Sequence, residues 1–158
     1  MTHRTLVTPR GLAKLHEQLR VYKEVERPKN VRDIEEARAH GDLRENAEYH
    51  AAKERQGMIQ AHCQHIETQI ATAEIIDPKT LSGSRVMFGA TVTLTDVETD
   101  QEVRYQIVGD DEADLASGQI SLNAPIARGM IGKETGDEVV VHTPKGKRNF
   151  VIEKVEFK

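Results

Sequence analysis

Two acidic residues, Asp42 and Glu45, follow a glycine in the run HGDLRENAEYHAAKERQG, residues 40–57. Two carboxylates three residues apart can share one face of a helical turn and hold a hard divalent cation such as Mg²⁺. Such a cation prefers about six oxygen ligands, so this pair could supply only part of a metal site. The alternative interpretation is that both acids simply complement the dipole at the start of a helix.

Basic side chains surround this acidic pair in the sequence. They form either a solvated helix face or a patch that contacts the phosphate backbone of a nucleic acid. The residues are Arg38, Arg44, Lys53 and Arg55.

The other chemical motifs are weaker. His62 and His65 stand beside the single cysteine, Cys63, which is a poor basis for a zinc site. Cys63 itself is expected to be a small buried hydrophobic residue. The acidic run GDDEAD, residues 109–114, lacks the ligand spacing of a calcium-binding hand and is expected to be an exposed loop. No phosphate-binding loop or nucleophile motif occurs in the sequence.

The acidic pair lies in a predicted turn between two helices. Gly41 accepts a left-handed backbone, and Asp or Asn can cap the following helix. Thr8 and Pro9 predict the start of the first helix, and Pro28 predicts a kink or a shift of packing phase within it. Apolar residues at spacings of three and four predict that the two arms pack as an antiparallel coiled coil. The predicted seams are Leu12, Leu15, Leu19, Tyr22, Val31, Ile34 and Ala37 on the first arm, and Tyr49, Ala52, Gln56, Ile59, Cys63, Ile66, Ile70 and Ala73 on the second.

After Pro78 the hydrophobic period changes from helical to alternating, which predicts short strands. Together with one helical turn at 125–131, the strands predict a compact α+β domain. The predicted strands are 91–95, 102–108, 120–122, 139–142 and 149–157. The chain is therefore divided into a helical hairpin at 1–76 with its tip at 41–45, a linker at 77–84 and an α+β domain at 85–158.

Composition favours a soluble cytoplasmic protein. The net charge of the 158 residues is −4, which gives no indication that the chain coats DNA or a membrane. Residues 1–76 hold 12 basic and 12 acidic side chains, a balance typical of a solvated coiled coil. A single cysteine excludes an internal disulfide. No apolar run approaches the ~20 residues that span a bilayer, and the N-terminus does not resemble a signal peptide.

The run at 40–57 closely resembles the hairpin tip of the bacterial Gre transcript-cleavage factors. The segments VMFGATVTL, IVGDDEADL and ISLNAPIARGMIGKETGDEVVV resemble the C-terminal domain of the same family. The resemblance covers essentially the whole chain in the right order and is closest to the GreA type. It implies an α+β protein in which an N-terminal antiparallel coiled-coil hairpin precedes a small FKBP-like domain.

The resemblance also implies a function. A Gre hairpin enters the secondary channel of RNA polymerase, where the tip carboxylates help to hold the second Mg²⁺ and orient the attacking water. The polymerase then cleaves the backtracked nascent RNA. Carried over to this chain, these roles assign Asp42 and Glu45 to the shared Mg²⁺, and Arg38 and Lys53 to contacts with the RNA 3′ end.

The same resemblance assigns Ser121, Asn123 and Pro125 to the surface that binds the polymerase. It further implies a monomer that has no metal of its own and no membrane partner, and that is a cofactor of an enzyme rather than an enzyme.

Two alternatives remain open. A homologue could occupy the same channel and inhibit the polymerase without supporting cleavage, although such an inhibitor could carry extra or displaced acids at its tip. An FKBP-like fold also raises the possibility of prolyl isomerase activity, but fold alone is no evidence for activity. The available aromatic residues, Phe88, Tyr105, Phe150 and Phe157, must in part build the core.

Overall fold

The computed structural model describes residues 4–42 and 46–158, and the chain divides into two compact units. Residues 13–72 form the first unit, which is a pair of antiparallel helical arms. Residues 4–12 and 73–158 form the second unit, which is built around a β-sheet. The predicted α+β class is confirmed. Among the described residues, no helix combines the length and the hydrophobicity needed to cross a membrane.

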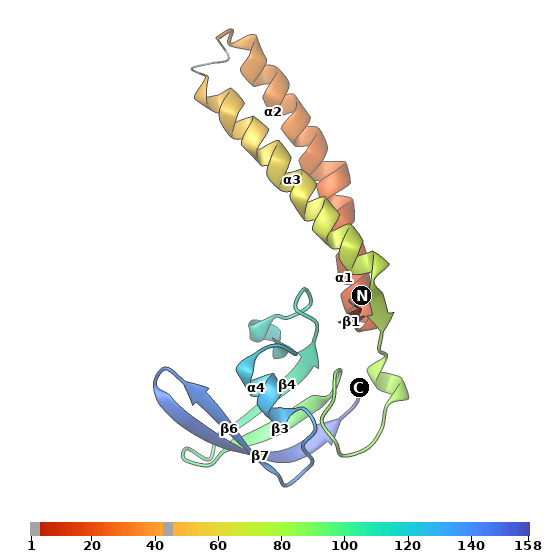
Figure 1. The fold of residues 1–158 in the computed structure, drawn as a ribbon, viewed down its shortest axis with the longest axis vertical. Helices are drawn as coiled ribbons and strands as arrows, with labels where there is room; N and C mark the ends of the chain where they lie inside the picture. Colours follow the sequence, from red (N-terminus) through yellow and green to blue (C-terminus); the bar gives the residue numbers. More distant parts are fainter. Residues whose placement is uncertain (1–3, 43–45) are drawn as a thin grey trace. The chain divides into compact units, whose positions relative to one another are not determined.

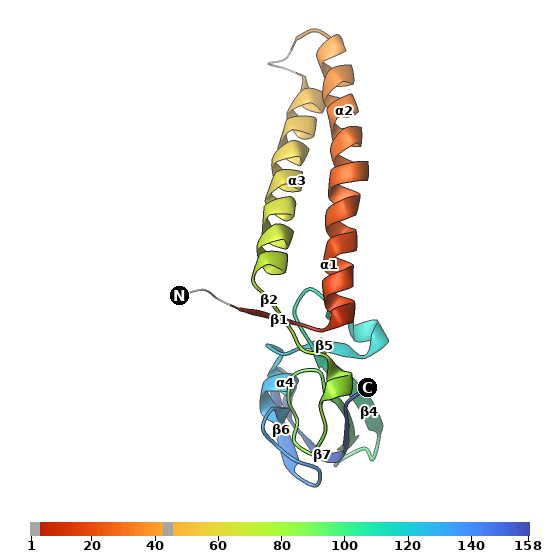
Figure 2. The same ribbon diagram turned by 90° about the vertical axis from the view of Figure 1, so that its right-hand side faces the viewer.

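The predicted helical hairpin is confirmed. In Figures 1 and 2 the helices α2 and α3 run side by side in opposite directions. The first arm consists of α1 (Pro9–Val21), a π-helical turn η1 (Tyr22–Glu26) and α2 (Arg27–Ala39), and the return arm is α3 (Ala47–Ala71). The predicted start of the first helix is also confirmed, because the Thr8 hydroxyl accepts a hydrogen bond from the Gly11 N–H at 3.0 Å.

The π-helical turn is the shift of packing phase that Pro28 predicted. Pro28 has no N–H to donate, and the preceding Arg27 N–H bonds to the carbonyl of Tyr22, five residues back instead of four. A π turn inserts one residue into the helical repeat and so moves the buried face by one position. The buried residues that follow are Asn30, Ile34 and Ala37. The predicted burial of Val31 is wrong, because 45% of that residue is exposed.

The seam of the return helix is confirmed in part. Its buried members are Ala52, Ile59, Cys63 and Ile66. Gln56 was predicted on this seam but is exposed, where its side chain accepts a hydrogen bond from the Lys53 ammonium at 2.9 Å.

The predicted extension of the return helix past Ala73 is wrong. The helix ends at Ala71, and β2 (Ala73–Ile75) pairs in parallel with β1 (Thr5–Val7), a strand that was not predicted. The Ile76 N–H extends this pairing by donating to the Val7 carbonyl at 2.8 Å. Parallel strands form hydrogen bonds between backbone groups that lie far apart in the sequence. A short sequence pattern therefore does not predict this pairing.

The sheet of the second unit has five strands in the order β5-β4-β3-β7-β6. Strands β4 and β5 are parallel and the other neighbouring pairs are antiparallel. The five predicted strands and the small helix are confirmed, with shifts of a few residues at some ends. The observed bounds are β3 (Thr91–Asp96), β4 (Glu102–Val108), β5 (Gln119–Ser121), α4 (Pro125–Met130), β6 (Glu138–Thr143) and β7 (Gly146–Glu156).

Helix α4 covers one face of this sheet. Ala127 and Met130 of α4 are fully buried in one cluster with Val139 of β6 and with Leu94 and Ile152 of the central strands. The apolar faces of alternating strands meet the helix there and exclude water, which is the main driving force for this unit.

One loop prediction needs correction, and the predicted linker proves to contain a short turn. The predicted linker contains a 3₁₀ turn, η2 (Pro78–Thr80), and Pro78 is buried. The acidic loop 109–114 is exposed only in part, because Glu112 is 4% exposed and accepts a hydrogen bond from the Thr8 hydroxyl at 2.5 Å. A buried carboxylate needs a hydrogen-bond donor, and here the donor is the hydroxyl of Thr8, near the start of the chain. A second 3₁₀ turn, η3 (Leu115–Ser117), follows the acidic loop.

Candidate functional site at the hairpin tip

The turn at the end of α2 begins at Gly41. Its φ of 101° lies in the left-handed region that glycine adopts without strain, as predicted from the sequence. The His40 and Gly41 N–H groups donate to the carbonyls of Ala37 and Arg38 at 3.2 and 3.1 Å, which closes the helix. Asp42 follows directly and is exposed. The turn therefore presents one carboxylate to solvent at the end of the rod.

The second predicted carboxylate, Glu45, lies outside the described residues. The joint use of Asp42 and Glu45 for one metal ion therefore stays a prediction. Among the residues that the structure describes, no three His, Cys, Asp or Glu side chains gather in a way that could hold a metal ion. An exposed Asp42 has the oxygen chemistry that Mg²⁺ prefers, and it fits the role of a partial ligand set.

Asn46 connects the two arms just beyond this segment. Its side-chain oxygen accepts a hydrogen bond from the Tyr49 N–H at 3.0 Å, so Asn46 is the N-cap of α3. Its side-chain nitrogen donates to the Ala37 carbonyl on α2 at 2.6 Å. The sequence predicted a capping role for Asp or Asn at the start of this helix, and the bond to Tyr49 is of that kind. No sequence pattern predicted the bond to Ala37, which joins the two arms.

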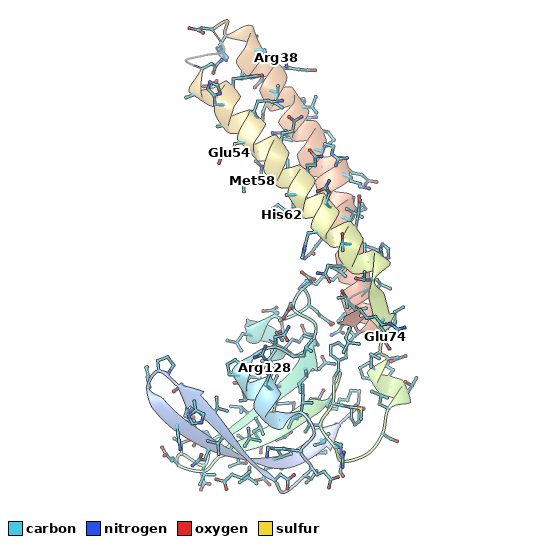
Figure 3. All side chains as sticks on the ribbon, viewed as in Figure 1. Arg38, Glu54, Met58, His62, Glu74 and Arg128 are labelled. Carbon is cyan, nitrogen blue, oxygen red and sulfur yellow. The ribbon has the colours of Figure 1, made fainter. Side chains whose placement is uncertain are left out.

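The two basic residues assigned to RNA lie on different arms. Arg38 extends from the last turn of α2 close to the tip, as its label in Figure 3 shows, and its guanidinium carbon is 5.9 Å from the centre of the Tyr49 ring. Lys53 is exposed on α3 and donates to Gln56 on the same helix. Both cations belong to the distal half of the hairpin, and their contact with RNA stays a prediction.

Pairs of side chains also join the arms below the tip. Ion pairs connect Arg55 to Glu26 at 2.8 Å and Lys23 to Glu67 at 2.9 Å. Exposed pairs of this kind contribute little individually because water screens them. The buried Asn30 is more specific, since its side-chain nitrogen donates to the Ala52 carbonyl at 2.9 Å. Asn30 therefore sets which turn of one arm lies beside which turn of the other.

The predicted polymerase-binding residues of the second unit form a local network. Ser121 and Asn123 both donate to the carboxylate of Asp110, the latter at 3.0 Å, and the Asn123 N–H donates to the Ser121 hydroxyl at 3.0 Å. Pro125, two residues on, is exposed at the first position of α4. The structure thus places these three residues on one continuous segment. Sequence reasoning missed Asp110, which holds the segment in place.

Comparison with known proteins agrees with this architecture. A family model described as "Transcription elongation factor, N-terminal" matches residues 5–75. A second model, described as "Transcription elongation factor, GreA/GreB, C-term", matches residues 81–157. The chain belongs to the GreA/GreB family of transcription elongation factors. The predicted resemblance to the Gre family is thereby confirmed.

Curated relatives favour the GreA type within the GreA/GreB family. "Transcription elongation factor GreA" of Caulobacter vibrioides is 55% identical over 151 residues, which is 96% of each chain. The protein of the same name from Phenylobacterium zucineum is 54% identical over 96% of each chain. Among solved structures, GreA factor homolog 1 (Gfh1) of Thermus thermophilus is 25% identical, covers 98% of this chain and 99% of its own, and has a TM-score of 0.45. The GreA assignment rests on the sequence relatives.

Proposed function

We propose that this GreA-type factor binds bacterial RNA polymerase and stimulates the polymerase's own cleavage of nascent RNA in backtracked complexes, which rescues stalled transcription. The observation that carries the proposal is the helical hairpin whose turn at Gly41 presents Asp42 to solvent. A narrow two-helix rod is suited to enter the secondary channel of the polymerase. Its exposed carboxylate would then reach the active centre, where the RNA 3′ end is displaced.

Asp42 and Glu45 would hold Mg²⁺ together with the aspartates of the polymerase. Together with a first Mg²⁺ held by the polymerase alone, this ion would stabilise the attacking and leaving oxygens of an in-line displacement. Asp42 contributes an oxygen ligand and an acceptor that can orient the attacking water. We also propose that the free protein binds no metal of its own, because two carboxylates supply only part of the roughly six oxygen ligands that Mg²⁺ prefers.

Arg38 and Lys53 would contact the displaced RNA. Both are exposed near the tip, and a cation there favours a nearby phosphate. Lys53 is a flexible point charge, so it suits a phosphate contact better than a stacked contact with a base.

The second unit would anchor the factor to the polymerase through Ser121, Asn123 and Pro125. We also propose that its five-stranded sheet and α4 form an FKBP-like fold that serves binding and has no isomerase activity. The factor would act as a cytoplasmic monomer and as a cofactor of the polymerase rather than as an enzyme.

The test is RNA cleavage in a stalled, backtracked polymerase complex, with the native protein compared to Asp42→Asn. Losing a ligand should reduce stimulated cleavage by at least ~10–100-fold, because substitutions of residues that merely hydrogen-bond to metal ligands already have effects of that size. The variant should still compete for polymerase, since its second unit is unchanged. Lys29→Ala, an exposed change on α2 away from the tip, is the matched control.

Each outcome has a distinct meaning. Equal stimulation by the native protein and Asp42→Asn would remove Asp42 from the chemistry. Binding to polymerase without stimulation by either protein would instead identify an inhibitor that occupies the same channel.

A further inference from the structure

The carboxamide of Asn46 has both of its polar atoms engaged, one on each arm of the hairpin. Its oxygen accepts from the Tyr49 N–H of α3, and its nitrogen donates to the Ala37 carbonyl of α2. Only this orientation of the carboxamide works, because an N–H can only donate and a carbonyl can only accept. Asn46 is half-buried, which shields these bonds from competition with water.

The two partners of Asn46 are backbone groups at helix ends, where the regular hydrogen bonds between residues four apart stop. Ala37 lies in the last turn of α2 and Tyr49 in the first turn of α3. The N–H groups of a first helical turn and the carbonyls of a last turn have no such regular partner within the helix. The Ala37 carbonyl also accepts the His40 N–H at 3.2 Å, so the same oxygen closes α2 and receives Asn46. One side chain therefore joins the end of one helix to the start of the other.

From these contacts we infer that Asn46 is a positioning residue for the Asp42 carboxylate. Asp42 directly follows the helix end to which Asn46 bonds. A bond between the arms at this place restricts where Asp42 can lie relative to the return helix α3. The inference rests on the proposed function, in which the Asp42 carboxylate must meet a metal held by another protein. Misplacement of a reacting group by about 1 Å can cost ~100-fold in rate.

Three substitutions separate the cap from the cross-arm bond. Asn46→Ser and Asn46→Asp both retain an oxygen that caps α3. Neither can donate to the Ala37 carbonyl, since Ser is too short and Asp has no N–H. Asn46→Ala loses both bonds. Because Asp adds a charge near the metal ligands and Ser does not, Asn46→Ser is the deciding variant.

The experiment measures stimulated cleavage at saturating factor across a range of Mg²⁺ concentrations, with polymerase competition and helix content in parallel. We expect Asn46→Ser to keep native helix content and native competition. Its cleavage rate should fall by about tenfold or more, and half-maximal cleavage should require more Mg²⁺. Native cleavage by Asn46→Ser, with only Asn46→Ala impaired, would reduce Asn46 to a helix cap and overturn the inference.

A second measurement tests the inference without the polymerase. In Asn46→Ser the amide of His40, which bonds to the same Ala37 carbonyl, should exchange with solvent faster, while the Tyr49 amide stays protected. Unchanged exchange at His40 would overturn the inference even if the proposed function holds. If the native protein does not stimulate cleavage, the proposed function fails, and the exchange result still decides whether Asn46 holds the two arms together.

Discussion

The hydroxyl of Thr8 donates to the carboxylate of Glu112 at 2.5 Å, although 104 residues separate them. Thr8 is also the residue that starts α1, since its hydroxyl accepts from the Gly11 N–H. Both side chains are buried. Gly11 permits this approach, because a Cβ on it would lie 2.5 Å from a Glu112 oxygen. One hydroxyl thus caps a helix and satisfies a buried carboxylate.

We predict that Glu112→Ala destabilises the protein. It leaves the buried Thr8 hydroxyl without its acceptor and opens a small cavity, which should cost about 1–3 kcal/mol. In a chain of this size that corresponds to a fall of roughly 2–4 °C in Tm per kcal/mol. Thermal unfolding measured by calorimetry checks it. Thr8→Ser, which keeps the hydroxyl, is the control, and an unchanged Tm for Glu112→Ala would contradict the prediction.

Substitutions at two neighbouring residues test which face of the first arm is buried after the π turn. Asn30→Ala removes a buried hydrogen bond between the arms and should lower the free energy of unfolding by ~1–2 kcal/mol. Val31→Ala changes a residue that is 45% exposed and should stay within ~0.5 kcal/mol. Denaturant unfolding of the two variants measures the difference. The reverse order of stability would show that Val31, and not Asn30, faces the other arm.

The Asp96 carboxylate should make stability depend on pH. Arg148 donates to it at 2.6 Å and lowers its pKa below the usual value, and the Glu98 N–H lowers it further. A carboxyl whose pKa is lowered by folding stabilises the native state above its unfolded pKa of ~3.9, and this stabilisation is lost as pH falls through the folded pKa. We therefore expect Asp96→Asn to lower Tm at pH 7.

The same reasoning predicts that the difference between the native protein and Asp96→Asn shrinks as the medium is acidified. Tm measured at several pH values between 2 and 7 checks this. Glu102→Gln, at an exposed position on β4, serves as the control. A constant difference down to the lowest pH would mean that the Asp96 charge does not contribute.

Lys53 tests the proposed contact with RNA. Lys53→Ala should reduce stimulated cleavage by about fivefold, the equivalent of the ~1 kcal/mol that an exposed ionic contact contributes at most. Lys53→Arg should retain activity, because a contact with a phosphate needs only the positive charge. Cleavage rates at two salt concentrations provide the measurement. If Lys53→Ala no longer competed for polymerase, the result would show that Lys53 contacts the polymerase and not the RNA.

Local patterns in the sequence predicted much of the fold because the structures they describe are themselves local. Thr8 and Pro9 start a helix, Gly41 ends one, and alternation at 91–95 and 102–108 marks strands β3 and β4. Each depends on backbone preferences within a few residues. The resemblance to the Gre family selected Asp42, Arg38 and Lys53 as site residues, and the structure describes all three as exposed.

The sequence by itself determined the long helices, the five strands of the larger sheet, the α+β class and the family, because helical and alternating periods and a contiguous motif can be recognised without knowing what they contact. Only the tertiary structure decided which residues those elements bury and bind. The π turn placed Asn30 instead of Val31 between the arms. Strand β1 pairs with β2, although the whole helical hairpin separates the two strands in the sequence. The Asn46 side chain donates a hydrogen bond to the Ala37 carbonyl on the other arm. These outcomes depend on groups distant in sequence coming within hydrogen-bonding range, which only packing in three dimensions brings about.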